Sequence, residues 1–128
     1  MHHARKTPEE LAAMAESALQ GAAGQLRLIL VELVAQLHPF PAFLNMVSIQ
    51  AIELEPELRP VQGRGCVVVC PDGEIRQLEL TGIPGVPGVS DVEGVEQFHE
   101  LDLPIGEYII YATTAIEALL VELRRRGK

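Results

Sequence analysis

A stripe of aliphatic and small side chains keeps to one face of a helical wheel through the N-terminal part of the chain. The stripe does not change phase at Gly21 or Gly24, so it predicts one continuous helix. We expect the helix to end near His38, because Pro39 cannot continue its hydrogen bonds. The members of the stripe are Leu11, Ala15, Ala18, Leu19, Ala22, Leu26, Leu30, Leu33 and Leu37.

The start of this helix is marked, and its length has a consequence for the whole fold. Thr7, Pro8 and Glu10 supply an N-cap, a proline at the first helical position and a capping box. About thirty helical residues span about 45 Å. A domain of 128 residues is only about 30 Å across. The helix is therefore expected to overhang its own core, and an overhanging apolar stripe needs a partner, most economically a second copy in a two-fold pair.

The middle of the chain reads as an antiparallel sheet. Apolar residues at period two predict a strand over Met46–Leu54, with a bulge near Ala51 where the apolar phase shifts. Residues 66–70 and 75–80, joined by a Pro-Asp-Gly-Glu turn, form the clearest hairpin. The uninterrupted apolar run of 66–70 indicates a central strand that is covered on both faces.

The C-terminal part ends in a second helix. Residues 81–95 place Gly, Pro and Val at intervals of three and are interpreted as a surface loop. A strand is favoured over a helix for 96–102. Residues 105–126 predict a helix whose core side carries Ile105, Ile109, Ala112, Ile116, Leu119, Leu120 and Leu123.

The fold class predicted from these elements is α+β. We expect a single domain over 1–128, with residues 1–6 as a flexible N-terminus. It combines a long N-terminal helix, an antiparallel sheet of three or four strands, and a C-terminal helix packed on one sheet face.

Both helices supply candidate interface residues, because the last helix also carries an apolar strip opposite its core side. A helix that is apolar on two sides is covered on both, either by the first helix or by another subunit. The predicted interface consists of Leu26, Leu30, Leu33, Val34, Leu37, Ile110, Thr114, Ala118 and Val121.

Composition limits the partners and the compartment. Eighteen acidic against ten basic residues give a formal charge of −8, which disfavours nucleic acid and anionic lipid. The longest apolar stretch, 26–37, is about twelve residues, whereas a bilayer span needs roughly twenty. No apolar leader follows the first residues, and two cysteines are too few for a disulfide framework. A cytoplasmic protein with no membrane or nucleic-acid partner is expected.

No chemical motif is strong enough to name a reaction. Phosphate-binding loops, dinucleotide fingerprints and hydrolase elbows are absent from the sequence, and no cofactor is expected. Cys66 and Cys70 are interpreted as small apolar core residues. Carboxylates gather between 91 and 102, but the favoured interpretation is a solvated acidic edge. The weak metal-ligand candidates in it are Glu96, His99, Glu100 and Asp102.

Three functions remain open, and the leading one is a small acidic interaction module that is homodimeric and non-enzymatic. A ligand-binding or metal-binding protein with 81–95 as a lid is the first alternative. The second is a secretion-type chaperone for a specific client, a group that the chain resembles in size, acidity, α+β character and dimerisation. An enzyme would have to use Cys70, His99 and the carboxylates of 91–102.

Overall fold

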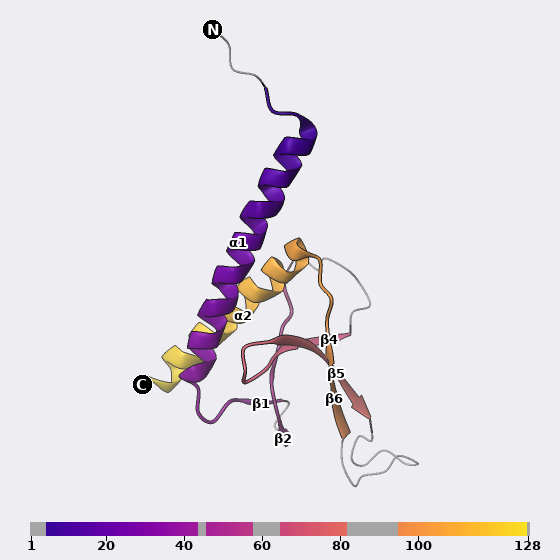
Figure 1. Cartoon of the computed structure of the whole chain (residues 1–128). Coiled ribbons are helices and arrows are strands. Elements are labelled where there is room, and N and C mark those ends of the chain that lie inside the picture. Colours follow the sequence, from indigo (N-terminus) through magenta and orange to yellow (C-terminus); the bar gives the residue numbers. More distant parts are fainter. Residues whose placement is uncertain (1–4, 44–45, 58–64, 82–94, 128) are drawn as a thin grey trace.

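The computed structural model describes residues 5–43, 46–57, 65–81 and 95–127 (Figure 1). Two helices and six strands follow one another in the order α1 (Pro8–Ala35), β1 (Ala42–Phe43), β2 (Met46–Gln50), β3 (Ile52–Glu53), β4 (Cys66–Val69), β5 (Ile75–Thr81), β6 (Val95–Glu100) and α2 (Ile105–Arg126). The α+β class, the long first helix, the antiparallel sheet and the final helix against the sheet are confirmed.

Helix α1 begins as predicted and ends slightly early. The Glu10 backbone N–H donates to Thr7 Oγ1 at 3.0 Å, and the Thr7 N–H donates to Glu10 Oε1 at 2.8 Å, which completes the capping box. The helix runs without interruption past both glycines to Ala35, and Gln36 caps it. It stops before His38 because the residue preceding a proline is disfavoured in the helical region. The His38–Pro39 peptide bond is cis.

The four-stranded sheet has the antiparallel order β3-β4-β5-β6. The β4–β5 hairpin is confirmed, with Val69 opposite Ile75 at its closed end. In its turn the Gly73 N–H donates to the Cys70 carbonyl, and Gly73 has φ +86°. The favoured strand interpretation of 96–102 is confirmed by β6, which pairs with β5 from Arg76↔Glu100 to Thr81↔Val95.

The prediction of one bulged strand over 46–54 is wrong. Strands β2 and β3 belong to different sheets, because β2 pairs with β1 and β3 pairs with β4. The chain changes partner at Ala51, whose N–H donates to the Pro41 carbonyl and which is itself buried. The shift in apolar phase therefore marks a change of sheet. Strand β1 lies in the proline-containing link for which no strand was predicted.

Two apolar clusters cover the two faces of strand β4. Val67 and Val69 pack into the larger cluster, which includes both helices. Val68 and Cys70 pack into the smaller one with residues from the β1–β2 side. All four side chains are buried, as the uninterrupted apolar run predicted. The sheet thus separates the helical layer from the small two-stranded sheet.

Helix α2 has the predicted bounds, but its buried face is rotated. Ala112 and Leu119 are buried as predicted, yet Tyr111 and Ala115 join them. The remaining members of the predicted core side are only half-buried. Tyr111 and Ala115 pack in the larger cluster with residues of α1 and of the sheet, which leaves the other predicted core residues of α2 less covered. These half-buried residues are Ile105, Ile109, Ile116, Leu120 and Leu123.

Candidate functional site

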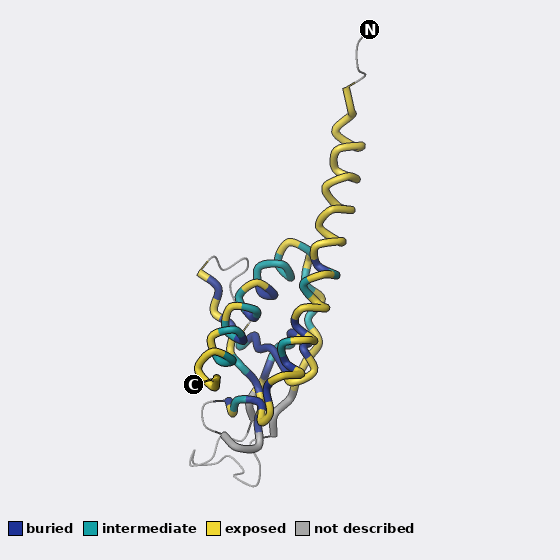
Figure 2. The backbone as a smooth tube through the Cα atoms, turned by 90° about the vertical axis from the view of Figure 1, so that its left-hand side faces the viewer, coloured by how far each residue is buried: buried dark blue, intermediate teal, exposed yellow. Residues whose placement is uncertain are grey.

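The N-terminal half of α1 carries exposed apolar surface. Every residue from 5 to 22 is exposed, and this part of the helix extends away from the rest of the fold (Figure 2). Leu11 and Met14 are each 52% exposed and Leu19 is 40% exposed. The overhang deduced from helix length is therefore present. We refer to residues 8–22 as the projecting segment.

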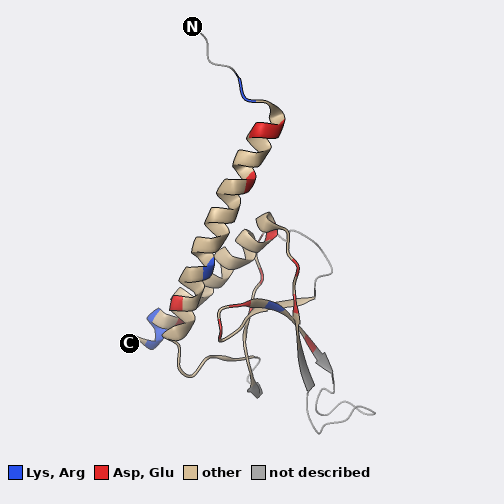
Figure 3. Cartoon of the chain, in the orientation of Figure 1, with Lys and Arg blue, Asp and Glu red and all other residues tan. Residues whose placement is uncertain are grey.

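The projecting segment is amphipathic although nothing described packs on it. At 3.6 residues per turn, Leu11 and Ala18 share one side, whereas Glu9 and Glu16 lie on the opposite side. Figure 3 shows long uncharged stretches of α1 between the few acidic positions of this segment. A helix with one apolar side and one acidic side is built to cover another apolar surface.

The same stripe continues onto the half of α1 that packs against the fold. Ile29 follows Leu11 by five full turns and is 44% exposed. Leu33, also in phase, is half-buried at the edge of the larger cluster, together with Ile116 of α2. The exposed apolar line therefore does not stop where the helix meets the body of the molecule.

The structure divides the predicted interface residues of α1 into two groups. Leu30, Val34 and Leu37 are buried in the core of the same copy and have no surface for a partner. Leu26 and Leu33 are half-buried beside them. Met14 and Ile29 were missed as surface residues, although the helical phase shared by Leu11 and Ile29 was a usable signal.

The predicted strip on α2 is partly covered by the chain itself. Ile110, Thr114 and Ala118 are half-buried, and only Val121 is well exposed, at 61%. The sequence offered the first helix or another subunit as the cover. The structure instead places strand β3 and the connector after it beside the strip, and both leave shallow pockets against α2.

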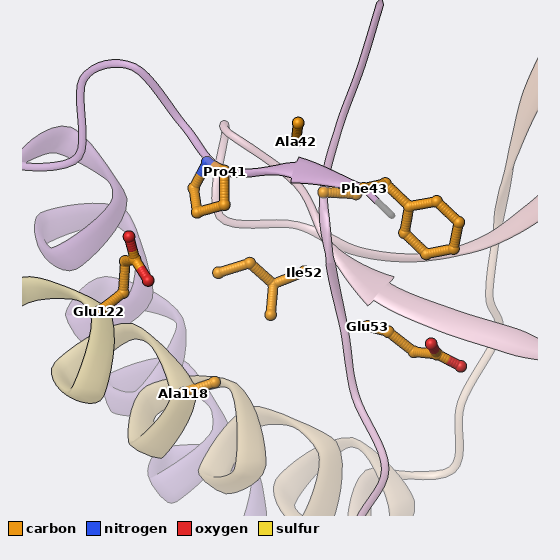
Figure 4. A pocket seen from close by; sticks show the side chains of 8 residues that line it. Pro41, Ala42, Phe43, Ile52, Glu53, Ala118 and Glu122 are labelled. Atoms are coloured by element: carbon orange, nitrogen blue, oxygen red, sulfur yellow. The ribbon is translucent and has the colours of Figure 1, made fainter. Parts of the chain in front are cut away.

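Two hollows among the described residues lie beside α2. The smaller, about 270 Å³, lies between Ala118 and Glu122 of α2 and residues of β1 and β3 (Figure 4). The larger, about 630 Å³, is lined in part by Thr113 and Thr114, whose hydroxyls donate to carbonyls of their own helix. It is lined by Glu55, Pro56, Glu57, Ile109, Ile110, Thr113, Thr114 and Glu117.

Among the described side chains, His99, Glu100 and Asp102 are not gathered into a metal site, and the side chain of Glu96 lies outside the described residues. His99 Nε2 lies 3.0 Å from Glu79 Oε1 on the neighbouring strand. Glu96, His99 and Glu100 belong to strand β6, and Asp102 follows it. Among the described residues, no group of three His, Cys, Asp or Glu could hold a metal ion. The proposed lid also lies outside the described residues, except for Thr81 and Val95, which end β5 and begin β6.

Both cysteines are free thiols with raised pKa values. Burial, together with Glu53, raises the pKa of Cys66 to about 11. Burial also raises the pKa of Cys70, which the Arg76 guanidinium partly offsets. A thiol with a raised pKa is a poor nucleophile at neutral pH. This agrees with the interpretation of the two cysteines as apolar packing residues.

Arg27 follows the projecting segment and contacts α2. Its guanidinium lies over the Tyr108 ring, 4.9 Å from the centroid, so the charge is accommodated by an aromatic face of α2. The contact joins residues of two different helices, and no sequence pattern identified Tyr108 as the neighbour of Arg27.

Comparison with protein families, with curated proteins and with solved structures finds no match for this chain. Within the described residues, α1 is long and apolar enough to cross a membrane by length and composition alone. Core helices of soluble proteins pass the same test, so this property does not separate a lipid partner from a protein partner.

Proposed function

We propose that this chain is a non-enzymatic interaction module that works as a homodimer in the cytoplasm and is held together by the exposed apolar side of α1. The observation that carries the proposal is the projecting segment, which is helical, amphipathic and exposed along its whole length. Two free thiols support a reducing compartment.

The projecting segment needs a partner for energetic reasons. An isolated helix of about fifteen residues is marginal in water, and Gly21 within this segment lowers its helix propensity further. Burying a large aliphatic side chain contributes about 1.5–3 kcal/mol. Leu11, Met14 and Leu19 are about half exposed, so each gains roughly half of that. Two symmetric copies bring six such side chains together, a gross gain of about 4.5–9 kcal/mol, which is set against an association cost of roughly 4–15 kcal/mol, so contacts further along α1 are also needed for a stable dimer.

A second copy is a better occupant of this surface than a bilayer. The hydrophobic window of α1 includes its C-terminal half, where Leu30 and Val34 are buried in the core and the turn at Gly73 approaches the helix backbone. Inserting that window into lipid would break these contacts. Arg27 and Glu32 would also have to enter the bilayer, at a cost of about 2.5–3.5 kcal/mol for each Arg at the centre.

Sedimentation equilibrium at tens of micromolar tests the proposal directly. Wild type is expected to be a dimer, and Leu11→Gln/Leu19→Gln is expected to be a monomer with an unchanged fold. Leu28→Gln is the matched control, because Leu28 is 68% exposed on the same helix but lies away from the stripe. A monomeric wild type would overturn the proposal.

Two further measurements test whether a lipid bilayer or a client protein, and not a second copy, covers the projecting segment. Co-sedimentation with neutral phosphatidylcholine vesicles that is lost in the double variant, without dimerisation in solution, would favour lipid. Stoichiometric recovery of one client with monomeric protein would favour the chaperone interpretation. Either result would replace the homodimer.

A further inference from the structure

We infer that the second copy packs antiparallel along α1, with the two-fold axis near Ala22, so that the projecting segment of each copy lies on the outer face of the other copy's α1. This inference rests on the proposed self-association and specifies its geometry. It is carried by the distribution of side-chain sizes along one continuous line of α1.

The two halves of that line are complementary in size. The N-terminal half presents Ala15 and Ala18, whereas the C-terminal half presents Leu26 and Ile29 at corresponding distances beyond Ala22. An antiparallel pair centred on Ala22 therefore places Ala15 opposite Ile29 and Ala18 opposite Leu26. Large residues facing small ones interdigitate, which is how close-packed contacts are made.

The ends of the line match as well. In the same register Leu11 of one copy lies opposite Leu33 of the other, and Ala22 meets its own symmetry mate. Leu11 is 52% exposed, and Leu33 is half-buried at the edge of the core cluster. A parallel pair would instead put the small residues opposite each other and the large ones opposite each other, which leaves one end loose and the other crowded.

The length of contact also favours this register. Leu11 to Leu33 covers about 33 Å of helix, whereas pairing of the projecting segments alone, from Leu11 to Ala22, covers about 17 Å. Stable interfaces bury about 800 Å² per partner. The longer contact covers about twice the length of helix and therefore comes nearer to that area.

Among the described residues, the body of the molecule leaves Ile29 of this face exposed and covers Leu26 and Leu33 only in part. The side of α1 that bears Leu30 and Val34 faces the core, and the turn at Gly73 touches the backbone at Leu30 and Val31. Ile29 lies on a different side and stays 44% exposed. The half-buried Ile116 of α2 lies, like Leu33, at the edge of the larger cluster, where the incoming segment can contact it.

Cysteine crosslinking distinguishes the register from self-association itself. The native thiols are buried or have raised pKa values, so they react slowly at neutral pH, and wild type provides the blank. With a short bis-maleimide, Ala22→Cys is expected to lose most of its monomer band. Ala15→Cys is expected to keep its monomer band, because its symmetry mate lies about 21 Å away along the helix. A mixture of Ala15→Cys and Ile29→Cys is expected to yield the mixed dimer.

Each alternative outcome has its own meaning. If the protein sediments as a dimer but Ala15→Cys links to itself, the antiparallel register centred on Ala22 is wrong and the inference is overturned while the proposed function stands. If Ala15→Cys links to Ala18→Cys and not to Ile29→Cys, only the projecting segments pair and the register is wrong. If wild type sediments as a monomer, both fall together. Circular dichroism of each variant shows that the fold is retained.

Discussion

The two halves of α1 belong to one continuous helix, yet their large apolar side chains have opposite surroundings. In the C-terminal half, Leu30 and Val34 are 0% and 4% exposed. In the N-terminal half, Leu11 and Met14 are both 52% exposed. The same periodic pattern thus serves the core at one end and faces solvent at the other.

This difference shows that amphipathicity specifies a face to be covered but not what covers it. The packed half has α2 and the β4–β5 turn as neighbours, because the rest of the chain reaches only that far along the helix. The projecting segment lies beyond their reach. Its stripe has the same physical need for burial, which a second copy can meet.

The largest contrast is expected between Leu30→Ala and Leu11→Ala. Leu30→Ala removes a fully buried side chain and should lower the free energy of unfolding by about 2–5 kcal/mol. Leu11→Ala, measured by urea denaturation at dilutions where the protein is monomeric, should change it by about 0.5 kcal/mol or less. Equal losses would mean that the projecting segment is packed against its own chain in solution.

A smaller loss of stability is expected when Gly73 is substituted, because the β4–β5 turn approaches the C-terminal half of α1 at this residue. A Cβ on Gly73 would lie 3.3 Å from the Val31 nitrogen, and φ of +86° disfavours any side chain. Gly73→Ala should therefore destabilise the fold by about 1–3 kcal/mol. Gly106→Ala is the control, because a Cβ on that helical glycine meets nothing within 4 Å, and it should stabilise by about 0.5–1 kcal/mol. Unchanged urea midpoints for Gly73→Ala would show that the turn does not need this close approach.

The smallest effect on stability is expected for the charge of Asp72, which lies in the same turn. Hydrogen bonds from the Arg76 guanidinium lower the pKa of Asp72, and burial opposes them in part. A lowered folded pKa gives stability that is present above the unfolded value, about 3.9, and is lost as the pH falls through the folded pKa. Asp72 is about half exposed, so the contribution should stay below about 1 kcal/mol.

The measurement is the thermal midpoint of wild type and Asp72→Asn from pH 6 down to pH 2. Wild type should be slightly more stable at pH 6, and the two curves should converge at the acid end. A gap that widens on acidification would contradict the assigned sign.

Much of the fold followed from local patterns. The capping box at Thr7, the Pro-Asp-Gly turn and the bounds of α2 each depend on neighbouring residues, and each was predicted at the right place. The strand change at Ala51 was not, because a shift of apolar phase looks the same whether a strand bulges or changes sheet.

The candidate site was predictable only in part. Helix length against domain size predicted an overhang, but not which leucines it contained. Leu30 and Leu11 were assigned to one broad stripe, but Leu30 lies about 100° around the helix from the line of Leu11 and Ile29, and only the positions of α2 and the turn decided which side became core. The Arg27–Tyr108 contact joins residues far apart in sequence, and no local pattern could indicate it.

The amino-acid sequence alone determined most of the helices and strands and the apolar pattern along each of them, since helix caps, turn residues and side-chain periodicity act over a few residues. The tertiary structure decided how much of each side is hidden, because burial depends on where distant segments come to rest. In α1 the change occurs between Ala22 and Ala23: every described residue of the helix up to Ala22 is exposed, and Ala23 is its first buried residue.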